Sequence, residues 1–171
     1  MALHEQCVGK SDEWYTPPHV FSAMGGSFDL DVSSPGRSVT PWIPAVDFIT
    51  SGSLDRDWRG FVWMNPPFGG RSGLIPWLEK FVAHGDGVCL VPNRTSAPWW
   101  QEFAPRADLA LFVARKIRFI AGFDDPEHDI VLGQPGKSPA QGTTLLACGP
   151  RGRENLRRAA ADGLGCLFKP V

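Results

Sequence analysis

The sequence lacks any clustering of the side chains that bind metals or form disulfides. Its 171 residues contain four cysteines and four histidines, which are widely separated and include no C-x-x-C pair. They are Cys7, Cys89, Cys148 and Cys166, and His4, His19, His84 and His128. Neither a metal site nor a disulfide framework is therefore expected. Isolated cysteines of this kind are typical of a reducing, cytoplasmic setting.

Long apolar runs and an excess of one charge are also absent. No apolar run reaches the roughly 20 residues that a membrane-spanning helix needs, and the first residues do not form a signal peptide, so no membrane association is expected. The formal net charge of −1 argues against wrapping of duplex DNA by bulk electrostatics, so any contact with nucleic acid must be local. The length fits one domain, residues 1–171, without a separate target-recognition domain.

Four short apolar runs do not alternate with polar residues, which is typical of strands in a sheet covered on both faces. The runs are 61–64, 88–91, 109–114 and 143–148, and a further strand is predicted at 28–32. Helical spacing of apolar residues, with proline and glycine near the ends, predicts helices at 17–24, 72–85, 97–103 and 154–161. This alternation predicts an α/β fold with a mostly parallel, doubly wound sheet and helices on both faces.

A doubly wound sheet binds ligands at the carboxyl ends of its strands. Two stretches rich in proline and glycine, 33–51 and 121–142, are predicted to be long loops over this edge of the sheet. Loops of such length are more often functional than idle.

A chemically distinctive tetrapeptide, Asn65-Pro66-Pro67-Phe68, directly follows the predicted strand at 61–64. An aromatic exocyclic amine is a poor nucleophile because its lone pair is delocalised, so a site that activates it must accept hydrogen bonds from both N–H groups. Asn65 Oδ1 and the Pro66 carbonyl oxygen can accept them, and Phe68 offers a ring on which an extruded base can stack. The tetrapeptide alone is also a good turn. Its position at a strand end favours the catalytic interpretation.

Several blocks in this sequence resemble, in the same order, the phage and prophage (Dam-like) type of DNA N6-adenine methyltransferase. The likeness extends from about residue 12 to residue 148. The blocks are D-E-W-Y-T-P at 12–17, F-D-L-D-V at 28–32, W-R-G at 58–60, N-P-P-F at 65–68, L-V-P-N-R-T-S at 90–96 followed by W-W at 99–100, and K-I-R-F at 116–119. Each block is weak alone, but their common order makes coincidence improbable.

The resemblance implies a single-domain, Rossmann-like class I methyltransferase. Its cofactor would be S-adenosylmethionine and its partner double-stranded DNA, with the methyl group transferred to the exocyclic amine of a flipped adenine. No metal is implied. The protein would act in the cytoplasm of a bacterial host and be encoded by a phage or prophage.

The resemblance also implies roles for individual residues. Thr16 and Pro17 would lie against the methionine part of the cofactor, and Asp31 would accept hydrogen bonds from its ammonium group. The other expected cofactor contacts are Trp14, Ser33 and Asp55. The expected DNA contacts are Arg71, Arg94, Lys116 and Arg118. For Arg94 a structural ion pair with a carboxylate such as Asp108 is the alternative.

Two departures from the family pattern leave the adenosine-binding residues open. The glycine-rich loop after the first strand is replaced by S-S-P-G at 33–36, and only Asp55 and Asp57 stand near the position of an expected acidic pair. Alternative functions are methylation of another planar nitrogen, in RNA adenine or protein glutamine, and a noncatalytic nucleic-acid-binding relative. The arginines between 151 and 158 form either a solvated helix face or a phosphate-binding one.

Overall fold

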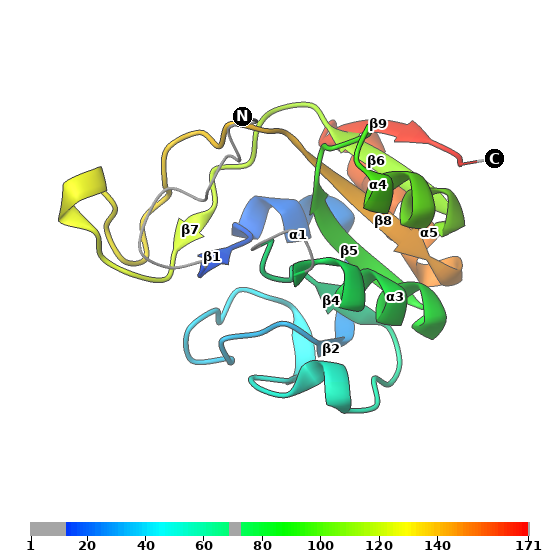
Figure 1. Ribbon diagram of the computed structural model, residues 1–171, viewed down its shortest axis with the longest axis horizontal. Helices are drawn as coiled ribbons and strands as arrows, with labels where there is room; N and C mark the ends of the chain where they lie inside the picture. Colours follow the sequence, from blue (N-terminus) through cyan, green and yellow to red (C-terminus); the bar gives the residue numbers. More distant parts are fainter. Residues whose placement is uncertain (1–12, 69–72, 171) are drawn as a thin grey trace.

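A mixed seven-stranded sheet forms the centre of the protein, with helices on both sides (Figure 1). The structure is a computed structural model that describes residues 13–68 and 73–170. The strand order is β3-β2-β4-β5-β8-β6-β9. These strands are β2 (Phe28–Asp31), β3 (Ala45–Phe48), β4 (Val62–Met64), β5 (Gly87–Pro92), β6 (Leu109–Val113), β8 (Thr143–Cys148) and β9 (Gly165–Phe168).

A second, two-stranded sheet pairs β1 (Trp14–Tyr15) with β7 (Ile120–Ala121) in the antiparallel sense. The α-helices are α1 (Pro18–Met24), α3 (Ile75–His84), α4 (Pro98–Phe103) and α5 (Gly149–Ala161). Three short 3₁₀ helices are η1 (Ser53–Asp55), η2 (Ala104–Arg106) and η3 (Pro126–His128). The segment between β7 and β8, which contains η3, extends away from the larger sheet (Figure 1).

Half of the larger sheet is parallel and half is antiparallel. Strands β3, β2, β4 and β5 are parallel neighbours, whereas β8 runs antiparallel to both β5 and β6, and β9 runs antiparallel to β6. The prediction of a mostly parallel sheet therefore holds only for the first four strands and is wrong for the rest. The chain from β6 to β8 contains no crossover helix, and a parallel return needs such a connection.

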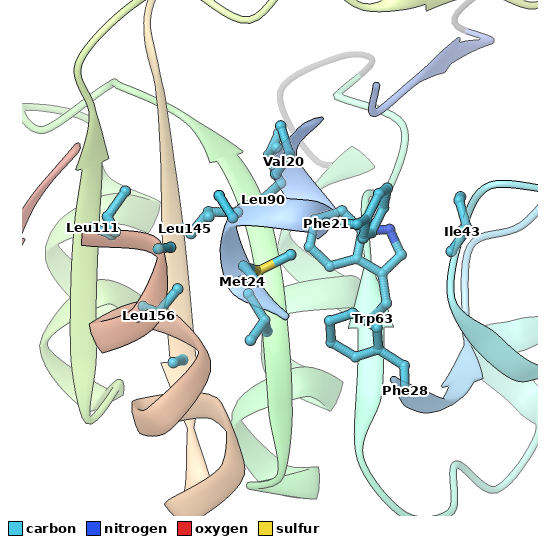
Figure 2. Close-up of a cluster of buried hydrophobic side chains, with 14 of the residues drawn as sticks. Val20, Phe21, Met24, Phe28, Ile43, Trp63, Leu90, Leu111, Leu145 and Leu156 are labelled. Atoms are coloured by element: carbon cyan, nitrogen blue, oxygen red, sulfur yellow. The ribbon is translucent and has the colours of Figure 1, made fainter. Parts of the chain in front are cut away.

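Both faces of the sheet are apolar because helices cover both of them, as predicted. Helices α1 and α5 pack on one face and α3 and α4 on the other. Trp63 in β4 belongs to the first core, while its neighbours Val62 and Met64 belong to the second. Figure 2 shows the first core, where Phe21 and Met24 of α1 lie beside strand residues.

The predicted helices and strands form with small shifts at their ends, and some strands were not predicted. All five predicted strands and all four predicted helices are present. Helix α5 begins at Gly149, five residues before the predicted start of 154, because Pro150 is tolerated in a first helical turn. Strand β3 lies inside the segment 33–51, which was predicted to be a loop, and β9 was not predicted.

The order of the strands creates a switch point between β2 and β4. From β2 the chain moves outward to β3, then crosses back to β4 on the other side of β2. The loops that leave β2 and β4 therefore diverge, and in open α/β sheets ligands bind at the carboxyl ends of the strands at such a point. Asp31 lies opposite Trp63 in the register, so the residues that follow each strand are neighbours.

Candidate active site

Asn65 is the first residue after β4 and joins the two loops at the switch point. Its main-chain N–H donates a hydrogen bond of 2.9 Å to the Ser33 hydroxyl, which lies in the loop after β2. The parallel pairing of β2 with β4 brings these residues together although 32 positions separate them in the chain. The tetrapeptide 65–68 thus lies at the edge of the sheet formed by the carboxyl ends of β2 and β4.

The side-chain amide of Asn65 is oriented by the main chain of Trp14 in β1. Asn65 Nδ2 donates a hydrogen bond of 3.0 Å to the Trp14 carbonyl oxygen. A carbonyl can only accept, so the amide nitrogen must face Trp14. Asn65 Oδ1 then points away from β1 and is available as an acceptor in the half-buried site.

The three residues after Asn65 differ in exposure. Pro66 is buried, Pro67 is exposed, and Phe68 is half-buried and packs against the cores on both sides of the sheet. The Phe68 ring is thereby anchored where the two helical layers meet the edge of the sheet. Arg71, an expected DNA contact, lies outside the described residues.

Asp31, the last residue of β2, is a buried carboxylate. Its side chain accepts hydrogen bonds from the Ser33 main-chain N–H, at 3.2 Å from Oδ1, and from the Ser34 side chain. Ion pairs between described residues do not include it. Burial raises the pKa of Asp31 from its ordinary value of 3.8 to about 6, although both hydrogen bonds act to lower it. A cationic ligand would offset the cost of this buried charge.

Thr16 lies in the turn between β1 and α1, with 1% of its surface exposed. Its main-chain carbonyl accepts a hydrogen bond of 2.9 Å from the Trp42 indole N–H, but its buried hydroxyl has no partner in the described part of the chain. A buried hydroxyl without a partner is uncommon in a folded protein. Pro17, the next residue, caps α1.

Thr16 and Asp31 match the two charged groups of an α-amino acid. The carboxylate of Asp31 suits an ammonium group, and the free hydroxyl of Thr16 can donate to a carboxylate. Both belong to segments that Asn65 connects, since Asn65 bonds to Ser33 after β2 and to Trp14 two residues before Thr16. The site can therefore hold an amino-acid group beside a hydrogen-bond acceptor for an amine.

Asp55 lies away from this network. It ends η1, is exposed, and follows the strand at the sheet edge. The main chain of η1 is held to α3, where Lys80 donates hydrogen bonds to the carbonyl oxygens of Ser53 and Leu54. Within the described ranges, hydrogen bonds connect Asp55 to neither Asp31 nor Asn65.

Three expected DNA contacts hold the segment 136–141. Arg94 Nε donates to Gln141 Oε1 at 2.9 Å, Lys116 Nζ to the Ala140 carbonyl at 2.7 Å, and Arg118 Nε to the Gly136 carbonyl at 2.8 Å. These acceptors are neutral, and the ion pairs found among described residues include none of the three cations. Within residues 13–68 and 73–170 their positive charges thus lack a carboxylate partner, and they can attract an anion.

The arginines of α5 have a different environment. Arg151 forms an ion pair with Asp29 at 2.7 Å, and Arg153 forms one with Asp108 at 2.9 Å. Asp108 is therefore bound by Arg153, and the alternative of a structural pair between Arg94 and Asp108 is wrong. These ion pairs favour a structural role for this helix face, in which Arg157 remains exposed.

Sequence reasoning missed the Ser33–Asn65 and Trp14–Asn65 hydrogen bonds that assemble the site. The partners are 32 and 51 residues apart, and the acceptor in the second bond is a main-chain carbonyl that any residue could supply. No local pattern could reveal these contacts. The W-x-T-P block suggested a role for the Trp14 side chain, not for its main-chain carbonyl.

Comparison with known proteins agrees with the chemistry of this site. The family model described as DNA N-6-adenine-methyltransferase (Dam) matches residues 5–130, more than half of the chain, and this range includes Thr16, Asp31 and Asn65. The chain belongs to the Dam family. The Dam family methylates adenine in DNA and generally uses S-adenosylmethionine. No curated protein and no solved structure matched the chain.

The helices of residues 13–68 and 73–170 include none that is long and apolar enough to cross a membrane. The same part of the chain contains no group of three or more His, Cys, Asp or Glu side chains arranged to hold a metal ion.

The buried Asp31 carboxyl predicts an unusual pH dependence of folding. Its pKa is about 6 in the folded state, against 3.8 ordinarily, so its stabilising contribution is complete below pH 3.8 and is lost as the pH rises through 6. Two pKa units correspond to about 3 kcal/mol. Asp31→Asn should therefore raise the unfolding free energy at pH 7 relative to wild type, and this difference should vanish near pH 4, as measured by urea denaturation.

Asp29 provides the matched control for this experiment. Its pKa is lowered, chiefly by the hydrogen bond from Arg151, so its contribution is present at neutral pH and is lost on acidification. Asp29→Asn should therefore destabilise at pH 7, opposite in sign to Asp31→Asn. An Asp31→Asn difference that stays constant from pH 4 to pH 7 would contradict the assignment.

Proposed function

We propose that this Dam-family protein transfers the methyl group of S-adenosylmethionine to N6 of an adenine extruded from double-stranded DNA. The main support is the orientation of Asn65. Its amide nitrogen donates a hydrogen bond to the Trp14 carbonyl, which leaves Oδ1 to accept a hydrogen bond from the adenine amine. We further propose that the sheet is that of a Rossmann-like class I methyltransferase. The switch point between β2 and β4 supports this, with β8 as an antiparallel insertion.

The cofactor would bind through its methionine part at the end of β2. Asp31 accepts hydrogen bonds from the ammonium group, and the Thr16 hydroxyl donates to the carboxylate beside the turn set by Pro17. When bound, S-adenosylmethionine supplies a methyl group activated by its sulfonium. The roles of Trp14, Ser33 and Asp55 in contacting the cofactor are further predictions, and that of Asp55 concerns the adenosine part.

Asn65 and Pro66 activate the adenine amine. Asn65 Oδ1 and the Pro66 carbonyl oxygen each accept a hydrogen bond from one N6 hydrogen, which favours a tetrahedral nitrogen whose lone pair is less delocalised. Transfer of the sulfonium-activated methyl group would make this nitrogen cationic while Asn65 and Pro66 hold its two hydrogens. The nitrogen would then lose one proton to water, so no strong base is required. The rate depends on position and on acceptor strength.

Phe68 would stabilise the extruded base. Leaving the duplex costs a few kcal/mol in lost stacking and pairing. Stacking on an aromatic side chain returns about 1–3 kcal/mol per base. The half-buried ring of Phe68 is anchored between the two cores next to Asn65, which supports this role.

DNA binding would be local and electrostatic. Arg94, Lys116 and Arg118 lie around the segment 136–141 without carboxylate partners in the described structure, which supports contacts with phosphates. Arg71 is predicted to add a contact from the loop that follows the catalytic tetrapeptide. A net charge of −1 is compatible with such a small footprint.

Replacing Asn65 by Ala tests the catalytic assignment. The variant should methylate DNA on the order of 10²–10³-fold more slowly, because one of two acceptors for the amine is lost. Single-turnover assays with unmethylated DNA, read as N6-methyl-2′-deoxyadenosine by nucleoside mass spectrometry, measure the rate. The dissociation constant for S-adenosylmethionine, from calorimetry, should stay unchanged because Asp31 and Thr16 are intact.

Two outcomes would overturn this proposal. If the wild type binds the cofactor yet forms no N6-methyladenine, the DNA acceptor is wrong, and labelled methyl transfer to RNA or glutamine peptides becomes the decisive assay. If Asn65→Ala is as fast as the wild type, the tetrapeptide is not catalytic.

Neutralising Arg94 or Lys116 tests the DNA contacts. Arg94→Gln and Lys116→Gln should each weaken DNA binding and reduce the slope of log affinity against log salt by about one. Fluorescence anisotropy at several salt concentrations measures both effects. Arg157→Gln, which removes an equally exposed charge from α5, is the matched control. Equal changes in all three variants would instead indicate nonspecific attraction by the whole surface.

A further inference from the structure

The hydrogen bond that orients Asn65 belongs to a larger arrangement around β1. Trp14 pairs with Ala121 and Tyr15 with Ile120, so β1 and β7 lie side by side. Ile120 in turn forms an antiparallel bridge with Pro135. The Trp14 carbonyl that receives the Asn65 amide is therefore part of a small sheet formed by the returning chain.

Two glycines allow this sheet to close tightly on β1. A Cβ atom on Gly136 would lie 2.4 Å from Cζ3 of the Trp14 indole, and one on Gly122 would lie 2.5 Å from the Tyr15 hydroxyl oxygen. Neither distance is possible for real atoms in van der Waals contact. The side chains of Trp14 and Tyr15 thus pack directly against the main chain of Gly136 and Gly122, where any larger residue would clash with them.

The Trp14 indole is also fixed from other directions. The Phe123 ring meets it edge-on, with 5.4 Å between ring centroids and an interplanar angle of 82°. Gly136 is itself anchored, since its N–H donates to the Phe119 carbonyl at 2.8 Å and its carbonyl accepts from Arg118 at 2.8 Å. A contiguous path of contacts therefore runs from Arg118 through Gly136 and Trp14 to Asn65.

We propose that Trp14 is a positioning residue for Asn65: the indole, held by Gly136 and Phe123, fixes the carbonyl that turns the Asn65 amide toward the substrate amine. The proposal rests on the proposed function for its effect on rate. It differs from the expectation that the Trp14 side chain contacts the cofactor. A misplacement of about 1 Å can cost on the order of 10²-fold in rate, so the main-chain contact is enough to matter.

The test compares Gly136→Ala with Gly73→Ala. The first inserts a methyl group against the Trp14 ring, whereas the second adds one where no atom lies within 4 Å. Gly136→Ala should lower the single-turnover rate on the order of 10²-fold and leave the dissociation constant for S-adenosylmethionine unchanged. Gly73→Ala should change neither quantity. Trp14→Phe keeps an aromatic ring but reduces its contact with Gly136, so it should give an intermediate rate. This second variant keeps the test decisive if Gly136→Ala does not fold.

A second readout does not depend on activity. The chain has three asparagines, Asn65, Asn93 and Asn155, so ¹⁵N-asparagine labelling gives three pairs of side-chain amide signals. The pair missing from Asn65→Ala belongs to Asn65. It should shift in Gly136→Ala and Trp14→Phe and stay in place in Gly73→Ala.

The outcomes separate the positioning role from the proposed function. An unshifted Asn65 signal in folded Gly136→Ala and Trp14→Phe would overturn the positioning role, as would a cofactor dissociation constant that rises in step with the loss of rate. A shifted signal with an unchanged rate would overturn it too. If the wild type forms no N6-methyladenine, the proposed function fails, while the amide signals still decide whether Trp14 holds Asn65.

Discussion

The site depends on two hydrogen bonds made by one residue. The main chain of Asn65 bonds to Ser33 and its side chain to the Trp14 carbonyl, which ties together the ends of β4, β2 and β1. Without them the tetrapeptide 65–68 would be an ordinary proline-rich turn at a strand end. With them, the amide nitrogen of Asn65 is already bonded to the Trp14 carbonyl, and the amide oxygen, Oδ1, points away from β1 as an acceptor.

The second constraint is electrostatic. Asp31 is buried without a cationic partner among the described residues, and Thr16 is buried with its hydroxyl unpaired, although a fold selected for stability alone would satisfy or remove both groups. Such groups are tolerated at binding sites because a ligand completes them. Arg94, Lys116 and Arg118, which have no carboxylate partner among the described residues, follow the same logic for an anionic ligand.

Local patterns in the sequence were enough to predict β2 and β4, whose ends carry Asp31 and Asn65, but not β1 or β7. The apolar runs of β4 and β5 indicate strands covered on both faces, and the residues after β4 are the basis of the proposed chemistry. The antiparallel entry of β8 between β5 and β6 was not predictable, because strand order is decided by pairings between distant segments. Strand β3 was hidden among prolines and polar residues, and β9 is an edge strand that begins with glycine, a residue disfavoured in strands.

The roles of particular residues divide in the same way. Asn65, Asp31 and Thr16 could be selected from motifs, since each chemistry is carried by a side chain. The contribution of Trp14 could not, because it acts through a main-chain carbonyl, and the closeness of Gly136 depends on the return of a segment more than a hundred residues later. For Arg94, the sequence could not exclude an ion pair with Asp108, which the structure shows bound to Arg153, and a contact with DNA stays a prediction.

In the proposed mechanism the methyl acceptor and the methyl donor meet between Asn65 and Asp31. A crystal structure of the protein with S-adenosylhomocysteine and a DNA duplex would test this arrangement. We expect an extruded adenine whose N6 lies about 3 Å from Asn65 Oδ1 and from the Pro66 carbonyl oxygen, with the cofactor ammonium bound to Asp31. An adenine that stays stacked, or a cofactor whose ammonium faces away from Asp31, would contradict it.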